Sequence, residues 1–145
     1  MALHLQASAV AIAGRALLLT GAPGVGKSAL ALELIDRGAA LIGDDGVLLE
    51  AAGGQLLASP VAATRGLIEL RNLGLFTLPV AERVPVALVL EFSSEAPRHV
   101  DAADLIELAG HKLPRLMIWP GLPAAARRAE MALARYGLPP TPSRT

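Results

Sequence analysis

Residues 21–28, GAPGVGKS, have the types and spacing needed to hold phosphate. They fit the pattern GxxxxGK[ST], which is typical of loops that bind the phosphates of a nucleotide. Backbone N–H groups at a helix N-terminus bind anions, and glycines let the backbone close around a phosphate. Lys27 would lie near the β and γ phosphates, and the Ser28 hydroxyl is a candidate ligand of Mg²⁺. The candidate nucleotide-binding residues are Gly21, Ala22, Pro23, Gly24, Val25, Gly26, Lys27 and Ser28.

Carboxylates and one histidine could supply the remaining chemistry. Asp44 and Asp45 follow the short apolar run ALIG, and phosphoryl transfer to a hydroxyl needs a carboxylate to orient or deprotonate the acceptor. Neighbouring side chains of an extended chain point to opposite faces, so one of the two could face the nucleotide while the other supports structure. The pair Asp45-Gly46 between apolar runs is also a strong signal for a hairpin turn, which needs no catalysis. Glu69 is a third carboxylate that could reach a metal, although a surface glutamate is the commoner case.

The elements around these residues predict an α/β or α+β domain with a mixed sheet and few helices. We expect strands over 5–13, 15–20 and 39–43, a hairpin around Gly53-Gly54, a strand with a loop over 65–74, and strands at VPVALVLEF and RLMIW. One helix should follow the glycine loop and end near Gly38, and another should run through AAARRAEMALARY with Pro123 in its first turn. Residues 1–138 then form one domain, and 139–145 a flexible tail.

Composition narrows the class of protein. Thirteen basic and thirteen acidic side chains cancel, which argues against a broad nucleic-acid or polybasic membrane surface. The absence of cysteine excludes disulfides and fits a reducing compartment, so we expect a cytoplasmic protein. The apolar start lacks a basic leading region and is broken at Gly14 and Arg15, so neither a signal peptide nor a membrane helix is predicted.

Three segments, taken in order, resemble the catalytic domain of the HPr kinase/phosphorylase family. They are LHLQASAVAIAG, LLLTGAPGVGKSALALELIDRGAALIGDDGVLL and GLIELRNLGL, and the resemblance runs from about His4 to the strand after residue 85. Members of that bacterial family phosphorylate a serine of the phosphocarrier protein HPr. The resemblance implies a fold related to phosphoenolpyruvate carboxykinase, ATP as the nucleotide and Mg²⁺ as the metal.

The resemblance also implies roles for individual residues. Ser28 and Glu69 look like Mg²⁺ ligands, and Lys27 and His4 look like active-site residues near the transferred phosphate. On residue type alone His4, between Leu3 and Leu5, is more often a half-buried strand histidine.

The acid/base assigned by the same resemblance is Asp45, with Asp44 beside it. Asp45 would accept the serine proton in the kinase direction. In the reverse direction, in which inorganic phosphate attacks phosphoserine, it would return a proton to the leaving oxygen. Arg98, in EAPRHVDAAD, is the candidate for the family's catalytic arginine in a flexible loop.

The chain departs from the family pattern in several places. Gly46 stands where an arginine usually follows the acidic pair, Asn72 stands where the family has glycine, and WPGLP replaces a GRN sequence after the final strand. Because His4 lies so near the start, we expect a short form without the family's additional N-terminal domain. The resemblance implies a homo-oligomer, a hexamer in the family.

Three functions are open at this point. The first is an ATP-dependent protein serine kinase, with phosphorylase activity as a second direction, acting on HPr or a related phosphocarrier of the phosphotransferase system that regulates carbohydrate metabolism. The second is an ATP-binding regulator that has lost transfer. The third is a small-molecule kinase, against which stands the lack of an arginine-rich lid pattern.

Overall fold

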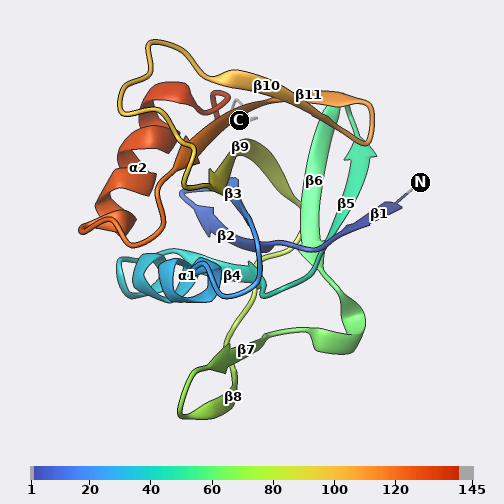
Figure 1. The fold of residues 1–145 in the computed structure, drawn as a ribbon. Coiled ribbons are helices and arrows are strands. Elements are labelled where there is room, and N and C mark those ends of the chain that lie inside the picture. The colour runs from blue at the N-terminus through green and yellow to red at the C-terminus, as the bar shows by residue number, and fades with distance from the viewer. Residues whose placement is uncertain (1, 141–145) are drawn as a thin grey trace.

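A computed structural model describes residues 2–140 and contains eleven strands, two α-helices and one short 3₁₀ helix within that range (Figure 1). Neither α-helix of the described part has the length and apolar character needed to cross a membrane. In chain order the elements are β1 (Ala2–Leu5), β2 (Ser8–Ile12), β3 (Arg15–Thr20), α1 (Lys27–Asp36), β4 (Ala40–Gly43), β5 (Val47–Ala52), β6 (Gln55–Pro60), η1 (Ala62–Thr64), β7 (Leu67–Leu70), β8 (Gly74–Thr77), β9 (Val84–Phe92), β10 (Asp104–Leu108), β11 (His111–Ile118) and α2 (Ala125–Tyr136).

The long strand β9 joins two sheets. Its first residues pair antiparallel with β6, which continues through β5 to β1. Its later residues pair in parallel with β3 on one side and β11 on the other. From β3 this second sheet runs through β2 to β4, and from β11 to β10. Parallel and antiparallel pairs therefore meet on one strand, as the expected mixed sheet requires.

The molecule has three layers, with α1 and α2 on one face of the second sheet and the first sheet on the other (Figure 1). Successive residues of a strand point to opposite faces, and β3 uses both. Leu17 and Leu19 pack in the core under the helices, together with Leu34 and Leu133. Leu18, between them, packs in the core between the sheets. Because β3 is buried on both faces, the chain that emerges from it at Thr20 is held firmly.

Most of the expected elements are confirmed, and the differences have local causes. The strand expected over 5–13 corresponds to β2, and β1 before it was missed. The two are separate because β1 pairs with β5 in one sheet whereas β2 pairs with β3 in the other. The loop expected before Gly74 is the turn of a hairpin, with β8 as its second strand. The sequence reading also missed β10, whose residues are mostly exposed.

The boundaries at the C-terminal end shift slightly. Helix α2 starts at Ala125 after Ala124 in a left-handed conformation, so Pro123 lies before the first turn rather than in it. Gly137 follows the helix as expected. Residues 139 and 140 have no regular structure, and the rest of the expected tail, 141–145, lies outside the described residues.

Candidate functional site

The glycine loop connects β3 to α1 at the carboxyl end of the central strand, which is where α/β proteins commonly bind ligands. Gly21 has a φ of 140°, and a Cβ there would lie 3.1 Å from the Cβ of Phe92. Gly26, at the helix start, is left-handed with a φ of 111°. Helix α1 has no side-chain N-cap and no acidic residue in its first turn. Its first N–H groups are therefore available to an anion.

Lys27 and Ser28 are the first two residues of α1. The Lys27 ammonium donates to the carbonyl oxygens of Gly21, at 2.6 Å, and Ala22, at 3.2 Å, so the charge lies against the loop itself. The Ser28 hydroxyl donates to Asp44 Oδ1 at 2.6 Å. This last bond links the helix start to the acidic pair that follows β4.

Asp44 is the centre of a small polar network. Its Oδ1 also accepts a hydrogen bond of 2.9 Å from Ser8, and its Oδ2 accepts one of 3.3 Å from the backbone N–H of Glu69. Ser8 is the one polar side chain in the buried core of the described part, with 1% of its surface exposed. Its hydroxyl also accepts a bond of 3.4 Å from the Asp45 N–H. The carboxylate of Asp44 is thus held in place from three elements.

Asp45 has a different environment from Asp44. Its side chain is exposed and accepts one long bond, 3.4 Å, from the amide of Gln6. It adopts a left-handed φ of 60°, which interrupts the strand alternation, so both carboxylates line the same cleft instead of pointing to opposite faces. A turn does lie here, as the Asp45-Gly46 pattern indicates. It is not a hairpin, because β4 pairs with β2 whereas β5 pairs with β1 and β6.

The network forms one wall of a cleft of about 830 Å³, which we call the loop cleft. The glycine loop and the start of α1 form a second wall, and the tip of the β7–β8 hairpin forms a third. Glu69 lines the cleft from β7 and is next to Asp44, since its backbone N–H donates to the Asp44 carboxylate.

The hairpin tip adds Arg71 and Asn72 to the lining of the cleft. The sequence analysis did not name Arg71, and it named Asn72 as a departure from the family pattern rather than as a site residue. Arg71 is the one arginine among the described residues that line the loop cleft. The signal available in the sequence was the position of both residues directly after Glu69 and Leu70. Without the hairpin register, nothing indicated that they turn back toward the loop.

His4 lies at the edge of this arrangement. It is exposed on β1, opposite Leu48 of β5. A Cβ on Gly46 would lie 3.2 Å from its Nε2, so the imidazole is next to the corner that carries Asp45. The arginine that usually follows the acidic pair in the family would not fit in this space without a shift of His4.

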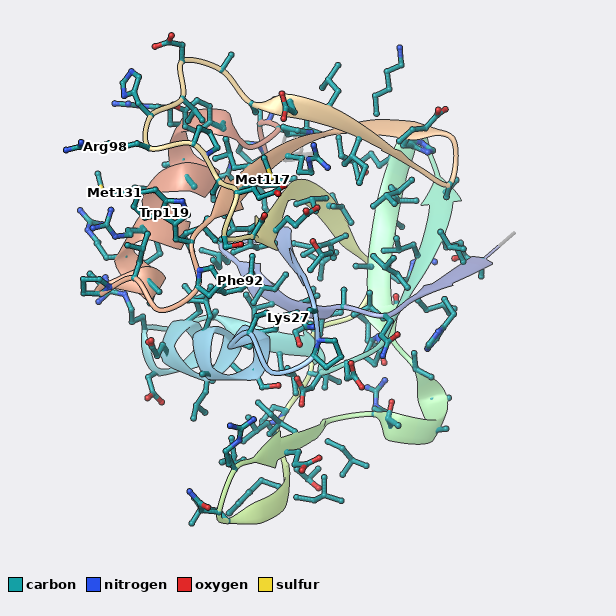
Figure 2. The ribbon with its side chains drawn as sticks, in the orientation of Figure 1. Lys27, Phe92, Arg98, Met117, Trp119 and Met131 are labelled. Atoms are coloured by element: carbon teal, nitrogen blue, oxygen red, sulfur yellow. The ribbon has the colours of Figure 1, made fainter. Side chains whose placement is uncertain are left out.

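Arg98 is placed elsewhere. It lies in the loop between β9 and β10 and lines a second cavity, beside α2, together with Trp119 and Met131. Figure 2 shows Lys27 at the start of α1 and Arg98 near Trp119 and Met131, with Phe92 between the two groups. The structure therefore does not bring Arg98 together with the residues of the loop cleft.

The oxygen donors of the loop cleft fit a magnesium ion. Mg²⁺ binds hard oxygen ligands and in nucleotide sites uses one or two protein carboxylates, with phosphates and waters completing the shell. The Ser28 hydroxyl, Asp44 and Glu69 are donors of this kind on neighbouring elements. No group of three His, Cys, Asp or Glu within residues 2–140 has the arrangement of an all-protein metal site, so a metal here would depend on the phosphates.

The fold and the loop cleft define a mixed-sheet protein with a GxxxxGK[ST] loop between a central strand and a helix. The family described as HPr Serine kinase C-terminal domain matches residues 2–82, more than half of the chain. The chain belongs to this family.

Individual relatives agree with that family. The chain is 43% identical over 70 residues to an HPr kinase/phosphorylase of Clostridium tetani. The aligned segment covers 48% of this chain and 23% of the relative. It is 33% identical over 144 residues to the HPr kinase/phosphorylase of Clostridium novyi, covering 89% of this chain and 47% of the relative. The chain thus spans less than half the length of these relatives.

A solved structure shares the fold. The Hpr(Ser) kinase/phosphatase from Coxiella burnetii superimposes with a TM-score of 0.79 at 24% identity, covering 91% of this chain and 89% of that one. The expected fold, a mixed sheet with few helices of the HPr kinase type, is confirmed.

Proposed function

We propose that this chain is an ATP-dependent protein serine kinase that transfers the γ-phosphoryl group to a serine of HPr or a related phosphocarrier of the phosphotransferase system. The observation that carries the proposal is the 2.6 Å bond from Ser28 to Asp44, beside an exposed Asp45. A loop that only binds a nucleotide needs little beyond its own backbone and lysine, whereas this site also supplies two carboxylates with different surroundings.

The glycine loop and Lys27 bind the phosphates of ATP in this proposal. The free N–H groups at the start of α1 donate hydrogen bonds to the phosphate oxygens, and the Lys27 ammonium moves from the loop carbonyls to the β and γ phosphates. Ser28 and Glu69 would hold Mg²⁺, and Asp44 orients the Ser28 hydroxyl through the hydrogen bond that it accepts from it. The metal, when bound, neutralises charge that develops on the transferred phosphoryl group.

Asp45 is the proton acceptor. Asp44 already accepts three hydrogen bonds, whereas Asp45 accepts one long bond and is open to the cleft. Asp45 takes the proton of the substrate serine while the serine oxygen attacks the γ phosphorus of ATP. The bond between the γ phosphorus and the oxygen that bridges it to the β phosphate then breaks, which releases ADP. In the reverse reaction an oxygen of inorganic phosphate attacks the phosphorus of phosphoserine, pyrophosphate forms, and the bond from phosphorus to the serine oxygen breaks. Asp45 takes the proton of the attacking phosphate and returns it to the serine oxygen.

Two further residues belong to the proposal with different support. His4 lies beside Gly46, next to Asp45, where it can orient the incoming serine or phosphate. The catalytic part of Arg98 stays a prediction without a geometric argument, since its side chain lines the other cavity. Arg71 is the arginine that the loop cleft offers to the transferred phosphoryl group.

The remaining features of the proposal follow the family. We propose that the protein works in the cytoplasm, as a homo-oligomer of the hexameric kind, and without nucleic acid or a membrane as a partner. Size-exclusion chromatography with light scattering tests the oligomeric state directly.

The decisive experiment is transfer from γ-labelled ATP, with Mg²⁺, to purified phosphocarrier proteins of the same organism. We expect serine labelling by the unchanged protein and a loss of at least about 10³-fold in Lys27→Ala and Asp45→Asn. Asp45→Asn should keep its affinity for a fluorescent ATP analogue, because it lies outside the glycine loop, whereas Lys27→Ala should lose much of it.

The controls separate the possible outcomes. Glu107→Gln, an exposed residue of β10 distant in sequence from the cleft, should leave transfer unchanged. Near-normal turnover in Asp45→Asn would overturn its assignment as the base. ATP binding without labelling of any phosphocarrier would contradict the assignment as a kinase. It would support the alternative of an ATP-binding regulator that has lost transfer.

A further inference from the structure

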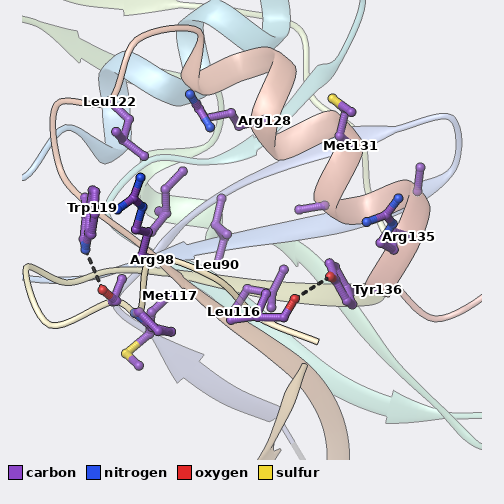
Figure 3. Close-up of a pocket in the computed structure, with 16 residues that line it drawn as sticks. Leu90, Arg98, Leu116, Met117, Trp119, Leu122, Arg128, Met131, Arg135 and Tyr136 are labelled. Atoms are coloured by element: carbon purple, nitrogen blue, oxygen red, sulfur yellow. Dashed lines mark hydrogen bonds between the residues drawn. The ribbon is translucent and has the colours of Figure 1, made fainter. Parts of the chain in front are cut away.

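The second cavity, which we call the α2 cavity, has a volume of about 770 Å³ and lies between α2, the end of β11 and the loop after β9 (Figure 3). Its floor is apolar and comes from the sheet: Leu90 on β9 and Leu116 and Ile118 on β11. Trp119 and Met131 stand at its mouth, 39% and 56% exposed. This volume is within the range of small-molecule sites in proteins.

Three arginines surround this apolar floor. Arg98 comes from the loop after β9, and Arg128 and Arg135 come from α2, where a spacing of seven residues puts both on one side of the helix. No aspartate or glutamate of the described part of the chain lines the cavity. Since the whole chain carries no net charge, this positive charge is local.

Among the described residues, these three arginines have no carboxylate partners. Five other arginines within residues 2–140 form ion pairs, namely Arg37, Arg65, Arg83, Arg115 and Arg127. None of Arg98, Arg128 and Arg135 does so in that range, although Arg128 Nε donates to the Pro123 carbonyl at 3.0 Å. Guanidinium groups beside an apolar floor are suited to bind a carboxylate, sulfonate or phosphate.

Two hydrogen bonds hold the wall of the cavity in place. The indole N–H of Trp119 donates to the Ala96 carbonyl at 2.6 Å, and the Tyr136 hydroxyl donates to the Val100 carbonyl at 3.4 Å. Figure 3 shows both bonds, and the carbonyls that accept them lie on either side of Arg98 in the loop. The loop is thereby tied to β11 and to α2, so a ligand does not have to order it.

We infer that the α2 cavity binds a small amphipathic organic anion, with an aromatic or branched apolar body on the sheet floor and an acidic group among the three arginines. The flat face of Trp119 suits a ring, and the guanidinium groups suit the acid. This inference goes beyond the proposed kinase and does not depend on it, because no lining residue of the α2 cavity lines the loop cleft.

The test uses two fluorescent probes with similar apolar bodies. Anilinonaphthalene sulfonate carries an anionic group, and phenylnaphthylamine is its neutral counterpart. Trp119 is the single tryptophan of the chain, so energy transfer from tryptophan to the probe reports binding near this cavity. We expect saturable binding of the anion with energy transfer, and binding of the neutral probe at least about tenfold weaker.

Variants then locate the anionic group. The double variant Arg128→Gln/Arg135→Gln and the charge variant Met131→Glu should each lower the affinity for the anionic probe at least about tenfold. The affinity for the neutral probe should change less than about threefold. These side chains are exposed, so the fold should tolerate all three changes. Arg127→Gln is the matched control, because Arg127 lies on the same helix but outside the cavity.

Three results would overturn the inference. One is equal affinity for the anionic and neutral probes, which would indicate an apolar patch without anion recognition. Another is unchanged binding of the anion in both the double variant and Met131→Glu. The third is binding without energy transfer from Trp119, which would place the probe elsewhere on the protein.

Discussion

The loop cleft and the α2 cavity are similar in volume and opposite in chemistry. In the loop cleft the polar side chains are hydrogen-bonded within the site. Ser28 and Ser8 donate to Asp44, and Lys27 donates to backbone carbonyls of the glycine loop. In the α2 cavity, three arginines surround an apolar floor without any carboxylate of the described part among the lining residues. A pre-ordered polar network positions groups for a reaction, whereas unpaired cations above an apolar floor provide recognition without chemistry.

The two regions also divide along the chain. All residues that line the loop cleft lie between 8 and 74, inside the family match of 2–82. All residues that line the α2 cavity lie between 90 and 136, beyond that match. Strand β9 connects them physically, since Leu90 is on the cavity floor and Phe92 packs against Gly21. The comparison therefore predicts two sites that can be altered separately unless β9 couples them.

The largest effect should come from Gly21→Ala. The new Cβ would meet Phe92 and Val25 at 3.1 Å in a backbone region that side chains rarely adopt. We expect a loss of about 3 kcal/mol in the free energy of unfolding and at least a hundredfold loss of nucleotide affinity. Urea denaturation and titration with a fluorescent ATP analogue measure the two quantities.

Gly24→Ala is the control for this change. Gly24 is also left-handed, with a φ of 82°, but a Cβ there would have nothing within 4 Å, so the cost should be about 1 kcal/mol. If Gly21→Ala also abolished binding of the anionic probe in the α2 cavity while the protein stayed folded, β9 would couple the two sites and their separation would be wrong.

A smaller effect is expected from Ser8→Ala, which tests whether the network of the loop cleft matters for catalysis. Removing the hydroxyl leaves Asp44 and the Asp45 N–H each with one hydrogen bond fewer. We expect a loss of about 1–3 kcal/mol in stability and a fall of about tenfold or more in kcat, with little change in the KM for ATP. Labelling kinetics at saturating ATP measure the rate.

Ser59→Ala provides a matched serine outside the cleft. Ser59 lies on β6, and its hydroxyl accepts a hydrogen bond of 2.9 Å from the backbone N–H of Arg83, so the loss of the hydroxyl should cost stability without changing kcat. Equal falls in kcat for both variants would mean that Ser8 acts only through stability. The positioning role of the buried hydroxyl would then be contradicted.

The loop cleft was predictable from sequence to the extent that its signals are local. Residues 21–28 follow a strand and open a helix, which the flanking apolar pattern already indicates. Ser8 was not predictable, since its contact with Asp44 spans 36 residues and depends on the pairing of β2 with β4. Arg71 was missed for a similar reason, because only the hairpin register turns it toward the loop.

The α2 cavity carried no sequence signal. Its arginines are separated by up to 37 positions, from 98 to 135, and share no motif. Its floor consists of strand residues whose apolar character already has an explanation as core. Arg98 was named as a catalytic residue from the family resemblance, and the sequence pattern did not indicate that the loop after β9 lies beside α2. Only the packing of α2 across β9 and β11 assembles the cavity.

The smallest effect should come from the ion pair that joins the helix of one region to the helix of the other. Arg37, just after α1, donates two hydrogen bonds to Glu130 of α2, at 2.8 and 2.9 Å. The hydrogen bond from Arg37 holds the pKa of Glu130 below its ordinary value. The stabilisation is therefore present at neutral pH, and it disappears as the pH falls below the ordinary glutamate pKa of about 4.3 and through the lower pKa of Glu130.

We expect Glu130→Gln to lower the melting temperature at pH 7 by no more than about 4 °C, because exposed ion pairs contribute little. The difference from the unchanged protein should shrink in acid, whereas Glu107→Gln, which removes an unpaired exposed carboxylate, should have no such dependence. Thermal unfolding followed by circular dichroism between pH 3 and pH 7 measures both variants.

Binding of the ATP analogue and of the anionic probe should stay unchanged in Glu130→Gln. A change in either would show that contact between α1 and α2, rather than β9, couples the loop cleft to the α2 cavity.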